Sequence, residues 1–183
     1  MVYKLALHLA LVSSALCLAY AEAAPEPSRS VTLSACRLPD IARPARCGTV
    51  EIPENPARPD GRRLDISIAI IPAAGGSALS DPIVPLMGGP AEDAQSVAPI
   101  FARYFASLLD DRDLVLIDQR GTGRSAPLRC DLSAADDPAA NLREFIPLAA
   151  IDRCREQLST RADLTQYTYP HFVEDLEQIR RAL

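Results

Sequence analysis

Residues 113–125 read Asp-Leu-Val-Leu-Ile-Asp-Gln-Arg-Gly-Thr-Gly-Arg-Ser, and this stretch is the strongest indication of the fold. The four apolar residues 114–117 predict a short strand that is buried on both faces, as in parallel sheets. The chain becomes polar at Asp118, and Gly121 and Gly123 free the backbone for a tight turn. Because ligands bind at the carboxyl ends of strands in open α/β sheets, this loop is a candidate site.

The segments upstream predict the start of the sheet. Residues 48–53 and 64–71 favour strands, and in the second of them Leu or Ile alternates with Asp, Ser or Ala. Residues 55–61, Asn-Pro-Ala-Arg-Pro-Asp-Gly, supply a turn, so the two strands should form an antiparallel hairpin. A third apolar run, residues 82–87, leads into Gly88-Gly89-Pro90. The predicted class is α/β, with an antiparallel first hairpin followed by parallel strands with flanking helices.

The spacing of apolar residues predicts three helices. The first begins near Ser96 and should pack on the sheet through Val97, Ile100, Phe101, Tyr104, Phe105 and Leu108. The second covers residues 141–158 and is kinked near Pro147. The last opens at residues 167–170, and its apolar positions are Phe172, Val173, Leu176, Ile179 and Leu183. Its acidic residues Glu174, Asp175 and Glu177 are expected on the outer face.

Residues 1–21 have the pattern of a secretory signal peptide: a short basic start, an apolar middle and small residues at the end. Cleavage is expected after Ala21, with Ala23 as a second position and an uncleaved membrane anchor as the alternative interpretation. Residues 22–35 should form a loose leader, and residues 36–183 the folded part. The protein is therefore expected to be secreted or periplasmic, with no stable membrane insertion after cleavage.

Charge and composition limit the partners. Removing the signal peptide deletes Lys4, the only lysine, and leaves 18 arginines against 24 acidic residues, a net charge of −6. Nucleic-acid surfaces need clustered basic charge, so no nucleic-acid partner is expected. The sequence indicates no cofactor.

Four cysteines follow the signal peptide, at positions 36, 47, 130 and 154. An even number in an exported chain indicates two disulfides, although four cysteines allow three pairings. A zinc site is the alternative. The spacings lack a Cys-x-x-Cys pair, however, and only one histidine follows the signal peptide, so no metal is expected.

Residues 118–125, Asp-Gln-Arg-Gly-Thr-Gly-Arg-Ser, resemble the Asp-Gln-Arg-Gly-x-Gly-x-Ser loop of α/β-hydrolases, in particular the secreted prolyl-iminopeptidase and tripeptidyl-aminopeptidase-like branch. Gly88-Gly89-Pro90 is similar to the family's His-Gly-Gly-Pro-Gly motif, but Met87 replaces the histidine and Ala91-Glu92 the last glycine. The resemblance implies that the N–H of Gly89 helps form an oxyanion hole. The residues expected to shape the site are Gly88, Pro90, Asp118, Gln119, Arg120, Gly121, Gly123 and Ser125.

The same branch carries similarly placed cysteines. Together with the short loop that each pair would close, this implies the disulfides Cys36–Cys47 and Cys130–Cys154.

In this family the catalytic residues follow in the order serine, acid, histidine, and the serine lies in a Gly-x-Ser-x-Gly motif. Residues 1–183 contain no such motif, and His171 precedes the place where the serine is expected. Ser125 has no base nearby in the sequence, so it is not expected to be a nucleophile. None of the triad is therefore present.

These features predict the N-terminal part of an exported serine hydrolase that acts on peptides or on small esters and amides once completed, and that is inactive alone. A stand-alone secreted binding or structural module is one alternative, and one half of a split hydrolase is another. The incomplete sheet should leave an apolar edge open beside residues 114–117. The turns at Gly88 and Gly121 should lie close together.

Overall fold

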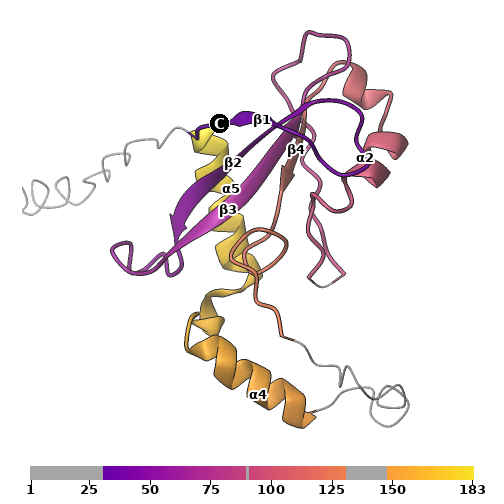
Figure 1. The fold of residues 1–183 in the computed structure, drawn as a ribbon. Helices are drawn as coiled ribbons and strands as arrows, with labels where there is room; N and C mark the ends of the chain where they lie inside the picture. The colour runs from indigo at the N-terminus through magenta and orange to yellow at the C-terminus, as the bar shows by residue number, and fades with distance from the viewer. Residues whose placement is uncertain (1–30, 90, 131–147) are drawn as a thin grey trace, which may run out of the picture.

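The computed structural model describes residues 31–89, 91–130 and 148–183 of the 183-residue chain. Within these ranges it forms a mixed α/β fold around one four-stranded sheet, whose strands lie side by side in chain order (Figure 1). The strands are β1 (Ser34–Cys36), β2 (Ala45–Pro53), β3 (Arg63–Ile71) and β4 (Leu114–Ile117). The proposed signal peptide and most of the leader, residues 1–30, lie outside the described residues.

The predicted hairpin is confirmed. β2 and β3 pair antiparallel from Arg46 opposite Ile70 to Pro53 opposite Arg63. The turn is closed by a hydrogen bond from the N–H of Glu54 to the carbonyl of Arg62, at 2.8 Å. The alternation in β3 therefore places its side chains on the two faces of the sheet, as expected from a period of two.

The predicted parallel strands are wrong for this sheet, because β4 pairs antiparallel with β3. Residues 82–87 run parallel to β4 but form only one isolated bridge, between Ile83 and Leu114. Residues that face the same neighbour alternate along an extended chain, so Pro85 is the next residue to face β4 after Ile83. Proline has no N–H to donate, which explains why the parallel ladder stops after one bridge.

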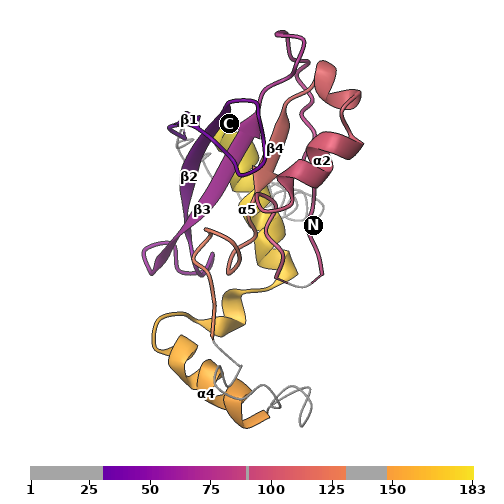
Figure 2. The same cartoon turned by 45° about the vertical axis from the view of Figure 1, so that its right-hand side comes forward.

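Two helices cover opposite faces of the sheet (Figures 1 and 2). Helix α5 (Tyr169–Ala182) packs Phe172 and Ile179 against one face. The strand residues on that face are Val50, Ile52, Leu64, Ile66, Ile68, Ile70, Val115 and Ile117. Helix α2 (Ala98–Tyr104) lies with Leu109 on the other face, against Ala69, Ile71, Leu114 and Leu116. All four residues of β4 are buried, as the sequence predicted.

The predicted helix near Ser96 is shorter than expected and packs differently. A 3-10 turn (Leu108–Asp110) follows α2, and the small residues Ala94 and Ala98 together with Leu109 enter the core. Much of the predicted apolar face is exposed, namely Ile100, Tyr104, Phe105 and Leu108. Because the 3.6-residue pattern is interrupted after Tyr104, that face does not continue along the sheet.

The last helix starts close to where it was expected. Helix α4 (Leu148–Ser159) covers the described part of the segment predicted at residues 141–158, and residues 141–147 lie outside the described residues. In α5, the expectation that Asp175 lies on the outer face is wrong, because its side chain is fully buried. Val173, one of the apolar positions of the predicted helix, is 62% exposed.

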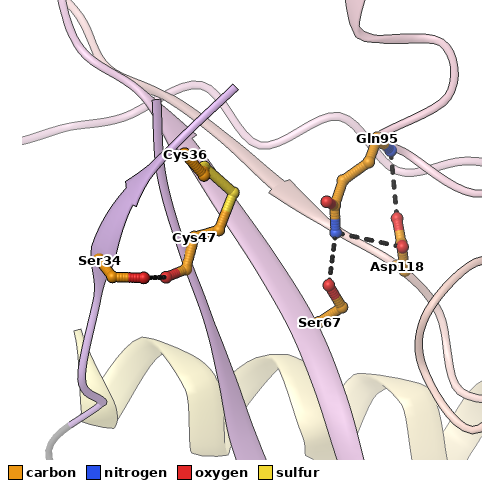
Figure 3. The surroundings of a disulfide bond; sticks show 6 residues. All are labelled: Ser34, Cys36, Cys47, Ser67, Gln95 and Asp118. Carbon is orange, nitrogen blue, oxygen red and sulfur yellow. Dashed lines mark hydrogen bonds between the residues drawn. A yellow bond between two sulfur atoms is a disulfide. The ribbon is translucent and has the colours of Figure 1, made fainter. Parts of the chain in front are cut away.

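Both predicted disulfides are present. Cys36–Cys47 joins β1 to β2 with a Cα–Cα distance of 5.8 Å (Figure 3). Cys130–Cys154 joins the chain after the glycine loop to α4, at 5.7 Å. None of the helices in the described ranges is long and apolar enough to cross a membrane.

Candidate functional site

The loop that follows β4 closes on itself through backbone hydrogen bonds. The N–H of Gly121 donates to the carbonyl of Ser125 at 2.8 Å, and the N–H of Leu128 donates back to the carbonyl of Gly121 at 2.9 Å. Gly121 and Gly123 have φ values of 84° and 49°, which side chains disfavour. A Cβ at Gly123 would also collide with Asp93 and with the carboxylate of Asp118. The loop therefore requires glycine at position 123 for two independent reasons.

Asp118 is the centre of a buried polar network (Figure 3). Its carboxylate accepts hydrogen bonds from the backbone N–H of Gln95, from the Gln95 side-chain amide and from the N–H of Arg124, each at 3.1 Å. The Gln95 amide also donates to the hydroxyl of Ser67 in β3, at 2.7 Å. This network ties residues 93–95, which follow the Gly88-Gly89 turn, to the loop after β4.

The carboxyl group of Asp118 is buried, and burial disfavours its charged form. Burial raises the pKa of Asp118, and hydrogen bonds from the N–H groups of Arg124 and Gln95 oppose that rise. The side chain therefore serves to hold two chain segments together, and its three donors all come from the protein itself.

Ser125 is a structural residue in this fold. Its side chain is fully buried, and its hydroxyl oxygen accepts a hydrogen bond from the N–H of Ser67 at 2.9 Å. A side chain enclosed in this way cannot reach a substrate carbonyl.

Arg120 points to the opposite side of the loop, into a buried ion pair with Asp175 of α5. The guanidinium donates to both carboxylate oxygens, at 2.7 and 2.5 Å, and to the backbone carbonyls of Glu54 and Gln166, at 2.8 and 2.9 Å. Burial raises the pKa of Asp175, and the attraction of Arg120 opposes that rise. One side chain thus joins the glycine loop, the end of the β2–β3 hairpin and α5.

Tyr167 and Glu54 complete this second cluster. The Tyr167 hydroxyl donates to the Glu54 carboxylate at 3.1 Å, and the ring lies against Gly121, where a side chain would collide with it. Burial, followed by the negative charge of Glu54, raises the pKa of Tyr167 to about 12. The phenol therefore stays protonated and holds its hydrogen bond at all physiological pH values.

The Gly88-Gly89 turn is open to solvent. Gly88 has no other atom close to where a side chain would lie, and Gly89 has a φ of 98°. The Glu92 carboxylate lies 3.3 Å from the Cβ position of Gly89, so negative charge stands beside the predicted oxyanion site. Pro90 lies outside the described residues. The backbone approaches the other loop a few residues later, where Asp93 meets Gly123.

The predicted site residues therefore separate into three groups. Asp118, Gly123 and Ser125 join the network of residues 93–95 and Ser67. Arg120 and Gly121 face α5 and Tyr167, and Gln119 accepts hydrogen bonds from Thr122 within its own turn. Gly88 and Gly89 remain at the surface. Their catalytic roles stay predictions.

Sequence reasoning missed Gln95, Ser67, Glu54 and Asp175. For Asp175 a signal was available, because it lies three residues after Phe172 and four before Ile179, on the apolar stripe of the helix. His171 is half-buried, and its Nδ1 lies 2.9 Å from the carbonyl of Gln166. No group of three His, Cys, Asp or Glu residues in the described ranges could hold a metal ion.

The comparisons with known proteins find a similarity to hydrolases over part of the chain. No protein-family model matches it. A stretch of 101 residues is 36% identical to Carboxylesterase B from two strains of Mycobacterium tuberculosis and to a Mycobacterium bovis protein named as a hydrolase. The match covers 52% of this chain but 18% of each relative. The chain thus has a partial, distant similarity to α/β-hydrolases, and none of these names refers to a peptidase.

Proposed function

We propose that this chain is the N-terminal part of an exported serine hydrolase, which cleaves small esters or amides or removes residues from peptide N termini. The observation that carries the proposal is the partial match with Carboxylesterase B. The contact of Asp93 and Gln95 with the loop after β4 supports it, because it ties the segment that follows the Gly88-Gly89 turn to the end of β4.

The proposed reaction follows the usual course of acyl transfer. A serine attacks the acyl carbon, a histidine takes the serine proton and returns it to the leaving group, and N–H donors hold the oxyanion. Residues 1–183 hold no Gly-x-Ser-x-Gly, so the triad would come from polypeptide outside this sequence. This chain would supply the N–H of Gly89 and the braced loop after β4, and it would be inactive alone.

Glu92 offers a direct test of the role of Gly89. If the Gly89 N–H holds an oxyanion, the nearby carboxylate raises the energy of that anion. Two charges about 4 Å apart in water repel by about 1 kcal/mol, which corresponds to roughly fivefold in rate. Glu92→Gln should therefore raise kcat/KM in a completed enzyme by about that factor. A decrease would contradict the assignment of Gly89.

A chimera can show whether this part of the chain can stand in a working hydrolase. The matched 101 residues would replace the corresponding stretch of M. tuberculosis Carboxylesterase B, and p-nitrophenyl butyrate would be the substrate. The unmodified relative is the positive control, and far-UV circular dichroism with thermal unfolding checks that the chimera is folded. A folded chimera without turnover would refute the proposal, whereas turnover by the 183-residue chain alone would refute its predicted inactivity.

Two further experiments test the substrate class and the cellular location. An aminoacyl p-nitroanilide assayed beside the ester decides between peptide N termini and esters in the chimera. Export is proposed because the two disulfides would persist only in an oxidising compartment. Recovery of the chain from the periplasm or medium with both disulfides formed would support it, and a reduced chain retained in the cytoplasm would contradict it.

A further inference from the structure

The side-chain oxygen of Gln95 is a buried acceptor that has no hydrogen bond in the described part of the chain. Gln95 is 5% exposed, and its amide nitrogen donates to the hydroxyl of Ser67 at 2.7 Å and to Oδ2 of Asp118 at 3.1 Å (Figure 3). Buried acceptors in folded proteins are almost always paired, because an unpaired one loses the hydrogen bond that water would give it. The network therefore has a place for one more donor.

A half turn of the Gln95 amide provides donors from within the network. The turn exchanges the amide oxygen and nitrogen, so that the oxygen lies about 2.7 Å from Oγ of Ser67 and about 3.1 Å from Oδ2 of Asp118. Two oxygens at such distances need a hydrogen between them. Ser67 has a hydroxyl hydrogen to donate, but Asp118 can donate only when its carboxyl group is protonated. The reversal is therefore coupled to the uptake of one proton.

We propose that Asp118 and Gln95 form a proton-linked switch, in which uptake of a proton by Asp118 reverses the Gln95 amide. In the protonated arrangement, the amide oxygen accepts from the carboxyl group of Asp118 and from the hydroxyl of Ser67. The proton comes from the solvent and binds at Oδ2, and the O–H bond of the carboxyl group is the one covalent bond that forms. In exchange, the two amide hydrogens leave these acceptors. Because each arrangement leaves one end of the amide without these partners, the buried charge of Asp118 decides between them.

The surroundings of Asp118 favour uptake of the proton. Burial is the largest influence and raises the pKa of Asp118, and the nearby carboxylate of Asp93 raises it further. The N–H groups of Arg124 and Gln95, together with the charge of Arg124, act in the opposite direction. Ser67, the neighbour on β3, does not titrate. The switch should therefore operate above pH 3.8, the ordinary pKa of this carboxyl group.

The switch controls how firmly the segment after the Gly88-Gly89 turn is held. Through Asp118, the network ties residues 93–95 to the loop after β4. The closed network binds the proton more tightly than an opened, solvated one does, because the opened network does not bury the charge. The closed network is therefore most stable in acid, and it loosens as the pH rises through the pKa of Asp118. This inference does not rest on the proposed hydrolase function.

Nuclear magnetic resonance of the oxidised 183-residue chain tests the switch directly. The carboxyl carbon of Asp118 and the side-chain N–H signals of Gln95 should titrate with one midpoint, and the N–H signals should move upfield in acid as they lose their acceptors. The side chain of Gln157, which is exposed on α4, is the internal control and should not follow this titration. Gln95 signals that stay in place while Asp118 titrates would overturn the proposal, as would an Asp118 that does not titrate in the folded chain.

Two variants separate this proton from others nearby. In Asp118→Asn the pH dependence of the Gln95 signals should disappear, whereas in Asp93→Asn it should persist with a midpoint at lower pH, because one negative charge has been removed. Hydrogen exchange measures the consequence for the segment. In the unmodified chain, protection of the Gln95 backbone N–H should rise by up to about tenfold for each pH unit below the midpoint. A Gln95 titration that survives Asp118→Asn, or protection that falls on acidification, would refute the switch.

Discussion

Removing the carboxylate of Asp175 should destabilise the fold more than any exposed charge change on the same helix. Asp175 and Arg120 are both buried, and the guanidinium donates to both carboxylate oxygens. In Asp175→Ala, the guanidinium keeps its bonds to the carbonyls of Glu54 and Gln166, but its charge is left buried without a partner. Breaking one partner of a buried pair costs about 3–5 kcal/mol, which is a large share of the stability of a typical domain.

Urea unfolding followed by circular dichroism measures this change. Glu177→Ala is the matched control, because Glu177 is an exposed carboxylate two residues further along α5 that also binds two arginines. It should shift the unfolding midpoint far less. If Asp175→Ala unfolds the chain completely, the double variant Arg120→Met with Asp175→Leu should restore folding, since it removes both charges and fills similar volume. A loss below about 1 kcal/mol in Asp175→Ala would refute the reasoning.

Three further changes address the glycine loop. Gly123→Ala should lower the free energy of unfolding by at least about 2 kcal/mol, because φ is 49° and the new Cβ meets Asp93 and Asp118. Gly88→Ala is the control and should change it by no more than about 0.5 kcal/mol, because nothing lies near its Cβ position. Equal effects in urea unfolding would be contrary to this packing. Tyr167→Phe should lower the free energy of unfolding by about 1–2 kcal/mol, because the buried Glu54 carboxylate loses the hydrogen bond from the phenol. The difference in ultraviolet absorbance between wild type and variant should show a phenol that titrates at a pH of about 12. Burial raises the pKa of Asp118 above its unfolded value of 3.8, so the folded protein binds the carboxyl proton more tightly than the unfolded chain does. The stability that this proton contributes is complete below pH 3.8 and is lost as the pH rises through the folded pKa. Relative to Asp118→Asn, wild type should lose stability as the pH rises from about 4, and the opposite slope would show that the hydrogen bonds outweigh burial.

Local patterns predicted those parts of the fold that local chemistry determines. The β2–β3 hairpin follows from alternating side chains around a turn of proline, asparagine and glycine, and β4 follows from a short apolar run. The direction of pairing for β4 could not be derived in this way. Its ladder with β3 forms between segments more than 40 residues apart, and one missing N–H at Pro85 reduces the expected parallel neighbour to a single bridge.

Long-range partners explain the other errors. The stripe from Val97 to Leu108 has helical spacing, but periodicity shows only which side chains share a face and not whether anything covers that face. Asp175 was assigned to the outer face because a buried carboxylate is costly without a partner. Its partner, Arg120, is 55 residues away and was itself placed in a site loop. No local pattern relates the two positions.

The polar groups of the two glycine turns are used in different ways, and this decides which turn can meet a ligand. In the loop after β4, the side chains of Asp118, Arg120 and Ser125 are buried and bonded to other parts of the protein. They shape the loop and are shielded from solvent. The turn at Gly88 and Gly89 is exposed, and within the described residues its N–H groups form no hydrogen bond. In the hydrolase proposed above, contact with an anion would therefore fall to the turn at Gly88 and Gly89, while Asp118 of the loop after β4 holds Gln95 by hydrogen bonds.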